Sequence, residues 1–142
     1  MRIQIPPQFL AIPYDFDRHP QSAAFDFDLG ANCQLYAFAL LLHFGICVPP
    51  FRSSDLWEDE THTEAVSDLL PLDLLLFHDN PNAWGAHVAV YIGDNSVVHL
   101  SKRVGIPAIA TIEEMLADPR YCVLIGAKRV RRAEMRSQPS PN

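Results

Sequence analysis

The pattern of apolar and polar positions divides this chain into one buried helix and several strands. Residues 33–44 are apolar on nearly every side and are followed by Gly45, a common helix stop, which predicts a buried helix. The continuous apolar run 72–77 predicts a buried strand. Residues 87–92 alternate, and after a Gly-Asp-Asn-Ser turn residues 97–100 return, so this part of the chain predicts a β-hairpin.

Weaker patterns complete the expected order of elements. Residues 112–116 predict a helix that Asp118 and Pro119 end, and residues 121–130 predict a last strand. The acidic stretch 52–68 predicts a short helix or a loop. Four prolines break residues 1–25 into short extended pieces, which predicts an ordered arm whose apolar residues lie on the domain surface.

Composition indicates one small globular domain. The chain has 142 residues, 49% of them hydrophobic and 20% charged, and its net charge of −6 argues against a general nucleic-acid binder. No run has the length of a membrane span, and the first residues lack the apolar core and cleavage site of a secretory signal. We therefore expect a cytoplasmic protein, or one exported by a route without a cleavable signal peptide.

Cys33 is the first candidate for chemistry because it opens the predicted helix. Asn32 is a favoured N-cap residue, so Cys33 falls in the first turn, where backbone N–H groups and the helix dipole stabilise an anion. This position predicts a lowered thiol pKa and a nucleophilic thiolate. The alternative is that Cys33 is a small buried apolar residue.

Two histidines of the hairpin, His87 and His99, are the candidate partners of this thiol. A symmetric turn would place His99 opposite Val90, on the wrong face, whereas one bulged residue would place it opposite Ala89, beside His87. We predict the bulge. Cys33 would then be the nucleophile, His87 the base and His99 the group that orients it. Taken singly, each histidine is more often a structural residue.

Four segments of the chain resemble a known family. They are similar in order and spacing to the Asp-Cys-Ser, Pro-Gly-Asp-Leu-Val-Phe-Phe, His-Val-Gly-Ile-Tyr-Ile-Gly and Ile-His-Ala segments of NlpC-type peptidoglycan endopeptidases. This family is a compact branch of the papain-like cysteine peptidases. The segments are Asn32-Cys33-Gln34, residues 71–77, residues 87–94 and Val98-His99.

The resemblance implies a fold and an activity. The fold would be α+β and papain-like, with a central antiparallel sheet and a buried nucleophile helix packed against it. The activity would be hydrolysis of amide bonds in bacterial cell-wall peptides, of the γ-D-glutamyl-diamino acid type, by a Cys33-His87-His99 triad. The backbone N–H of Cys33 would contribute to the oxyanion hole. No cofactor or metal is implied.

The chain departs from the family around the nucleophile. Asn32 and Gln34 stand where the family has Asp and Ser, and Gln21 stands where it has an upstream Tyr. Because an amide carries no full negative charge, the usual preference for a substrate ammonium group is in question. Asn32, Gln34 and Trp84 are the candidate substrate-binding residues.

The resemblance also suggests boundaries: an N-terminal arm at 1–25, a catalytic domain at 26–130 and a flexible basic tail at 131–142. Five basic residues gather near the C-terminus, and we expect a solvated tail or contact with an anionic partner; they are Lys128, Arg129, Arg131, Arg132 and Arg136. Cys47 and Cys122 are expected to be reduced core residues, with one disulfide as the alternative. Asp73 is expected to cap or salt-bridge a strand start.

Three other functions remain open. The same fold could support an amidase or acyltransferase that acts on a non-wall substrate. It could also bind wall fragments or a protein partner without turnover. A zinc site formed by Cys33, His87 and His99 is the third possibility, but no CxxC or HxxxH pair accompanies these residues.

Overall fold

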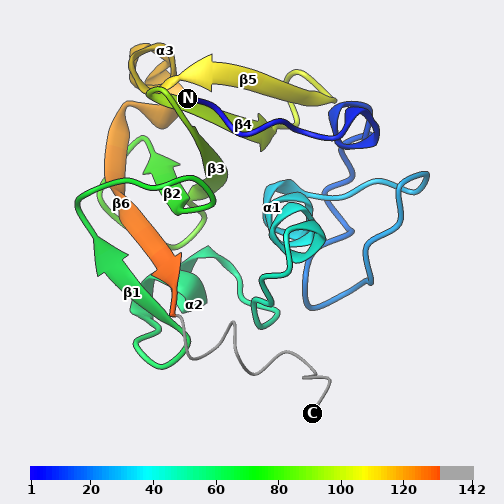
Figure 1. Cartoon of the computed structure of the whole chain (residues 1–142), viewed down its shortest axis with the longest axis horizontal. Coiled ribbons are helices and arrows are strands. Elements are labelled where there is room, and N and C mark those ends of the chain that lie inside the picture. Colours follow the sequence, from blue (N-terminus) through cyan, green and yellow to red (C-terminus); the bar gives the residue numbers. More distant parts are fainter. Residues whose placement is uncertain (132–142) are drawn as a thin grey trace.

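The computed structural model describes residues 1–131 and has an α+β architecture built on one six-stranded antiparallel sheet (Figure 1). The strand order is β1-β6-β2-β3-β4-β5. The strands are β1 (Thr63–Val66), β2 (Leu74–His78), β3 (His87–Gly93), β4 (Ser96–Leu100), β5 (Pro107–Thr111) and β6 (Val123–Val130). The helices are α1 (Cys33–His43), α2 (Ser53–Glu58) and α3 (Ile112–Ala117), with 3-10 turns at Pro7–Leu10 and Pro119–Tyr121.

Helix α1 begins and ends where the sequence predicts. The Asn32 side chain accepts a hydrogen bond from the Leu35 N–H at 2.9 Å, which is an N-cap. At the other end Gly45 adopts a φ of +85° and its N–H donates to the Leu42 carbonyl at 2.9 Å. The position of Cys33 at the start of α1 therefore follows from local sequence.

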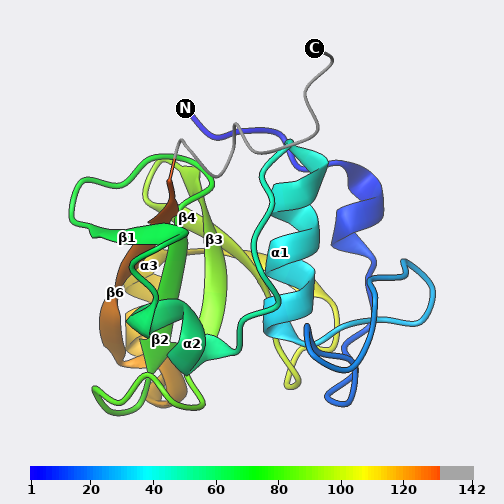
Figure 2. The same cartoon turned by 90° about the horizontal axis from the view of Figure 1, so that it is seen from below.

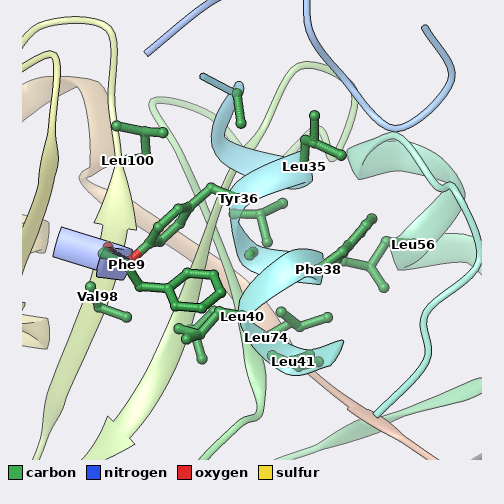
Figure 3. Packing of buried hydrophobic residues seen from close by; sticks show 14 of the residues in the cluster. Phe9, Leu35, Tyr36, Phe38, Leu40, Leu41, Leu56, Leu74, Val98 and Leu100 are labelled. Atoms are coloured by element: carbon green, nitrogen blue, oxygen red, sulfur yellow. Dashed lines mark hydrogen bonds between the residues drawn. The ribbon is translucent and has the colours of Figure 1, made fainter. Parts of the chain in front are cut away.

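The sheet separates two hydrophobic clusters. The larger cluster joins α1, the N-terminal arm and one sheet face, and Figure 3 shows Tyr36, Leu40 and Leu74 meeting there. The smaller cluster lies on the other face with α3. Its buried members are Leu75, Phe77, Ala89, Val97, Ile112, Met115 and Ala127.

The N-terminal arm contributes to the larger cluster. Phe9 and Ile12 are buried, and the Tyr36 hydroxyl donates to the Phe9 carbonyl at 2.7 Å. Figure 2 shows α1 standing between this arm and the sheet. The arm is ordered, as predicted, and three of its apolar side chains, Ile5, Phe9 and Ile12, lie in the core instead of on the domain surface.

Two short strands escaped the sequence patterns. The stretch 52–68 contains α2 and also β1, and residues 107–111 form β5. Both are edge strands, and β1 has four residues of which two are exposed, so neither shows a clear alternation.

The basic residues of β6 have partners within the domain, which corrects the expectation of a solvated cluster. Lys128 is 2% exposed, and its Nζ donates to the carbonyls of Trp57 and Asp59. Arg129 pairs with Asp73 through two hydrogen bonds of 2.8 Å, so Asp73 does form a salt bridge at the start of β2. Arg132 and Arg136, like most of the predicted tail, lie outside the described residues.

The other two cysteines also differ from expectation. Cys47 and Cys122 are free, as predicted, but both are exposed and neither belongs to the core. Within residues 1–131, no helix has the length and apolar character needed to cross a membrane.

Candidate active site

The β3–β4 hairpin contains the predicted bulge. Val90 lies opposite Val98, but Gly93 lies opposite Ser96, so the register shifts by one residue between Tyr91 and Gly93. Asp94 and Asn95 form the turn with φ values of 50° and 59°, which suit a tight hairpin. Continued along the strands, this register places His99 on the same side as His87.

The two histidine rings are in direct contact. His87 Nε2 and His99 Nδ1 are 2.8 Å apart, and the rings are nearly perpendicular at 86°. Tyr121 stacks on His87 with a centroid separation of 4.6 Å and also meets the edge of His99. The ring of His87 is thus fixed from two sides, and no residue in the range 1–131 is hydrogen-bonded to its Nδ1.

Both imidazoles are held neutral by their surroundings. Burial, together with the neighbouring His99, moves the pKa of His87 well below its usual 6.5. Burial lowers the pKa of His99 to about 4. The carboxylate of Asp118 opposes both shifts. Near neutral pH the pair can therefore accept a proton.

The Cys33 thiol lies at the start of α1, close to the first residues of β3. The backbone N–H groups of Cys33, Gln34 and Val88 stabilise negative charge on its Sγ. Neither histidine is hydrogen-bonded to Sγ in the described part of the chain.

The expected low thiol pKa is wrong for this structure. Burial raises the pKa of Cys33 above its usual 9.0, and this outweighs the three backbone N–H groups and the positive charge of Arg52. The prediction rested on the helix N-terminus alone, whereas desolvation depends on side chains packed from elsewhere in the chain. In the resting protein the thiol is therefore neutral.

Asn32 and Gln34 join a polar network beside the thiol. Both are 4% exposed, and the Asn32 Nδ2 donates to Gln34 Oε1 at 3.1 Å. Arg52 Nε donates to the same oxygen at 3.0 Å. Trp84, in contrast, is 75% exposed in the loop before β3, and its role in binding stays a prediction.

Sequence reasoning missed four residues of this region: Tyr14, Arg52, Asp118 and Tyr121. Burial, then the nearby Cys33 and Tyr121, raise the pKa of Tyr14 to about 12, so a tyrosine from the arm approaches the Cys33 thiol. Gln21 instead bonds to Pro50 and Asp55. Only long-range packing brings Tyr14 here, and no local pattern signals it.

A small hollow opens beside the histidine pair. It has a volume of about 150 Å³, and its lining includes His99, Ser101, Asp118, Arg120 and Tyr121. Among residues 1–131, no group of three or more His, Cys, Asp or Glu side chains is arranged to hold a metal ion.

Solved structures with the same architecture are known, although no protein-family model matches the chain and no curated protein does so. An NlpC/P60 family protein from Bacillus cereus matches with a TM-score of 0.61 and 25% identity over 86% of this chain. The peptidoglycan hydrolase RipB from Mycobacterium tuberculosis matches with a TM-score of 0.59 and 18% identity over 88% of this chain. The NlpC/p60 domain of the peptidoglycan hydrolase SagA matches with a TM-score of 0.54 and 17% identity over 76% of this chain.

The chain is shorter than most of these neighbours. It covers 36% of the Bacillus cereus protein and 59% of RipB, but 84% of the SagA domain. The shared architecture therefore spans only part of the two larger proteins. With its antiparallel sheet and the cysteine at the head of α1, this chain has the NlpC/P60 fold.

Proposed function

We propose that this protein is a thiol-dependent hydrolase of amide bonds in bacterial cell-wall peptides, of the γ-D-glutamyl-diamino acid type. Cys33 is the nucleophile, His87 the base and His99 the residue that orients the base. The observation that carries the proposal is the 2.8 Å contact between His87 and His99, together with the backbone N–H of Val88, the residue after His87, which reaches the Cys33 thiol at the start of a buried helix.

The chemistry uses neutral partners. His87 carries its proton on Nε2 and donates it to His99 Nδ1, which leaves His87 Nδ1 free to accept the thiol proton. Sγ attacks the amide carbon as this proton moves, and His87 then protonates the departing amine as the C–N bond breaks. Water hydrolyses the thioester and restores the thiol.

Three backbone N–H groups support the charged stages of this reaction. Those of Cys33, Gln34 and Val88 stabilise negative charge at Sγ, and the N–H of Cys33 is also available to the carbonyl oxygen as it becomes an oxyanion. By the resemblance to papain-like enzymes, α1 acts as the nucleophile helix. The peptidoglycan hydrolases among the structural neighbours support a cell-wall substrate.

Cys33→Ala tests the proposal directly. Because the substitution removes the nucleophile, digestion of muropeptides should fall by about a thousandfold or more, as followed by mass spectrometry. Cys122→Ala, which removes an exposed thiol, is the matched control and should retain activity.

Two outcomes would contradict the proposal. Full activity in Cys33→Ala would remove this thiol from the mechanism. Binding of wall fragments by the unaltered protein with no cleavage would instead favour a non-catalytic binding domain.

A further inference from the structure

A guanidinium group without a carboxylate partner lies beside the candidate nucleophile. Arg52 is partly buried just before α2, and its Nε donates to Gln34 Oε1 at 3.0 Å. Within residues 1–131, no Asp or Glu oxygen lies within 4.0 Å of this guanidinium, whereas Arg129 and Arg120 both have such partners. A positive charge that the protein leaves unpaired near a reactive group is available to a ligand.

Gln34 fixes this arginine and adds to its donors. Its Oε1 accepts from both Asn32 Nδ2 and Arg52 Nε, which determines the orientation of the amide. The Nε2 of this 4% exposed side chain has no acceptor among the described residues. Together with the two terminal nitrogens of Arg52, the network offers donors and no unused carboxylate, which is the chemistry that recognises an anion.

The charge of Arg52 reaches the thiol. It lowers the pKa of Cys33, Tyr14 and His19 relative to burial alone, so all three groups lie within range of its field. The nearest acidic residue in sequence, Asp55, accepts hydrogen bonds from the Arg52 backbone N–H and from Gln21. Its carboxylate is thus occupied at the cap of α2 and leaves the guanidinium free.

We infer that Arg52 and Gln34 bind a free carboxylate of the substrate next to the bond that Cys33 attacks. This inference rests on the proposed function for its choice of substrate. A γ-linked glutamyl residue retains an α-carboxylate near its scissile amide, whereas the α-amidated form of the same residue does not. The site would therefore select γ-D-glutamyl peptides over their γ-D-isoglutaminyl counterparts.

The first test uses the thiol itself and needs no wall substrate. Iodoacetate is an anion of similar size to neutral iodoacetamide, and alkylation at each cysteine can be timed by peptide mass spectrometry at pH 9. We expect the iodoacetate-to-iodoacetamide rate ratio at Cys33 to exceed that at Cys47 and Cys122 by about fivefold. The two exposed cysteines supply the reference ratio within the same molecule.

Variants connect this ratio to Arg52. In Arg52→Gln the ratio at Cys33 should fall to that of the exposed cysteines, while Arg52→Lys should keep it raised because the charge remains. Arg2→Gln removes the same charge at an exposed position and should change nothing. An unaltered ratio in Arg52→Gln would overturn the inference. So would a Cys33 thiol that reacts with neither reagent, because a site beside the thiol cannot hold an anion that is unable to reach it.

The second test measures selectivity between the paired peptides. We expect kcat/KM to be about tenfold higher for the γ-D-glutamyl peptide than for the isoglutaminyl form, and Arg52→Gln should remove the difference. Equal rates on both peptides would overturn the inference. Cleavage of neither peptide, with the alkylation ratio still raised, would refute the proposed function and leave the anion site standing.

Discussion

At the scale of single residues, the site depends on groups that burial keeps uncharged. His87, His99 and Cys33 all have pKa values displaced toward the neutral form. The sequence allowed two registers for the hairpin, and the predicted bulge, which decides which face His99 occupies, is confirmed. The neutral thiol could not be predicted, because its desolvation comes from chain segments distant in sequence.

The neutral state of His99 predicts how stability depends on pH. The unfolded chain binds a proton at this ring near pH 6.5, whereas the folded protein binds it only near pH 4. Stability is therefore lost as the pH falls through this window. Protonation of His99 should lower the free energy of unfolding by about 2 kcal/mol at pH 5 relative to pH 7.5.

Urea unfolding of the protein and of His99→Gln at these two pH values measures this effect. The difference in the free energy of unfolding between the two pH values should be about 2 kcal/mol smaller in the variant than in the unaltered protein. His43→Gln alters an exposed histidine at the end of α1 and should behave like the unaltered protein. The same pH dependence in all three proteins would contradict the prediction.

At the scale of elements, the central strands and α1 could be predicted because their apolar patterns are long and regular. The edge strands β1 and β5 could not, since each is stabilised by pairing with a neighbour and not by its own sequence. Helix α2 shows a further tertiary effect. Its Trp57 ring lies directly on Gly126 of β6, and Lys128 Nζ lies over the same ring, 5.8 Å from its centroid.

Gly126→Ala tests the packing of α2 on β6. A Cβ at this position would lie 2.5 Å from Trp57 Cη2, so the ring must move. We expect a loss of about 2 kcal/mol in the free energy of unfolding. In Trp57→Leu, where the ring is absent, the same glycine substitution should cost little, and an equal cost in both backgrounds would exclude the clash as the cause.

At the scale of the whole molecule, the arm and the sheet share one core. The sequence predicted an ordered arm, but its prolines and scattered apolar residues did not reveal which side chains are buried. Ile12 is 1% exposed, and the Tyr36 hydroxyl ties α1 to the arm through the Phe9 carbonyl. The arm therefore stabilises α1 on the side opposite the sheet (Figure 2).

Ile12→Ala measures the contribution of the arm. Because the residue is fully buried in the larger cluster, we expect the free energy of unfolding to fall by about 3 kcal/mol. Leu10→Ala, in the same arm but 37% exposed, should cost less than about 1 kcal/mol. Circular dichroism and tryptophan fluorescence should report one shared transition. Because Trp57 and Trp84 both lie outside the arm, an early transition seen by circular dichroism and not by fluorescence would show that the arm unfolds alone.

The place of β6 between β1 and β2 has a consequence for how the chain reaches its native state. Residues 63–66 pair only with residues 127–130, so β1 has no strand to join until almost the whole described chain has been synthesised. Such distant pairing slows folding and leaves backbone donors of nascent strands open to other chains. Ribosome-bound fragments that stop before residue 123 should accordingly remain sensitive to proteases, however complete their β2–β5 meander.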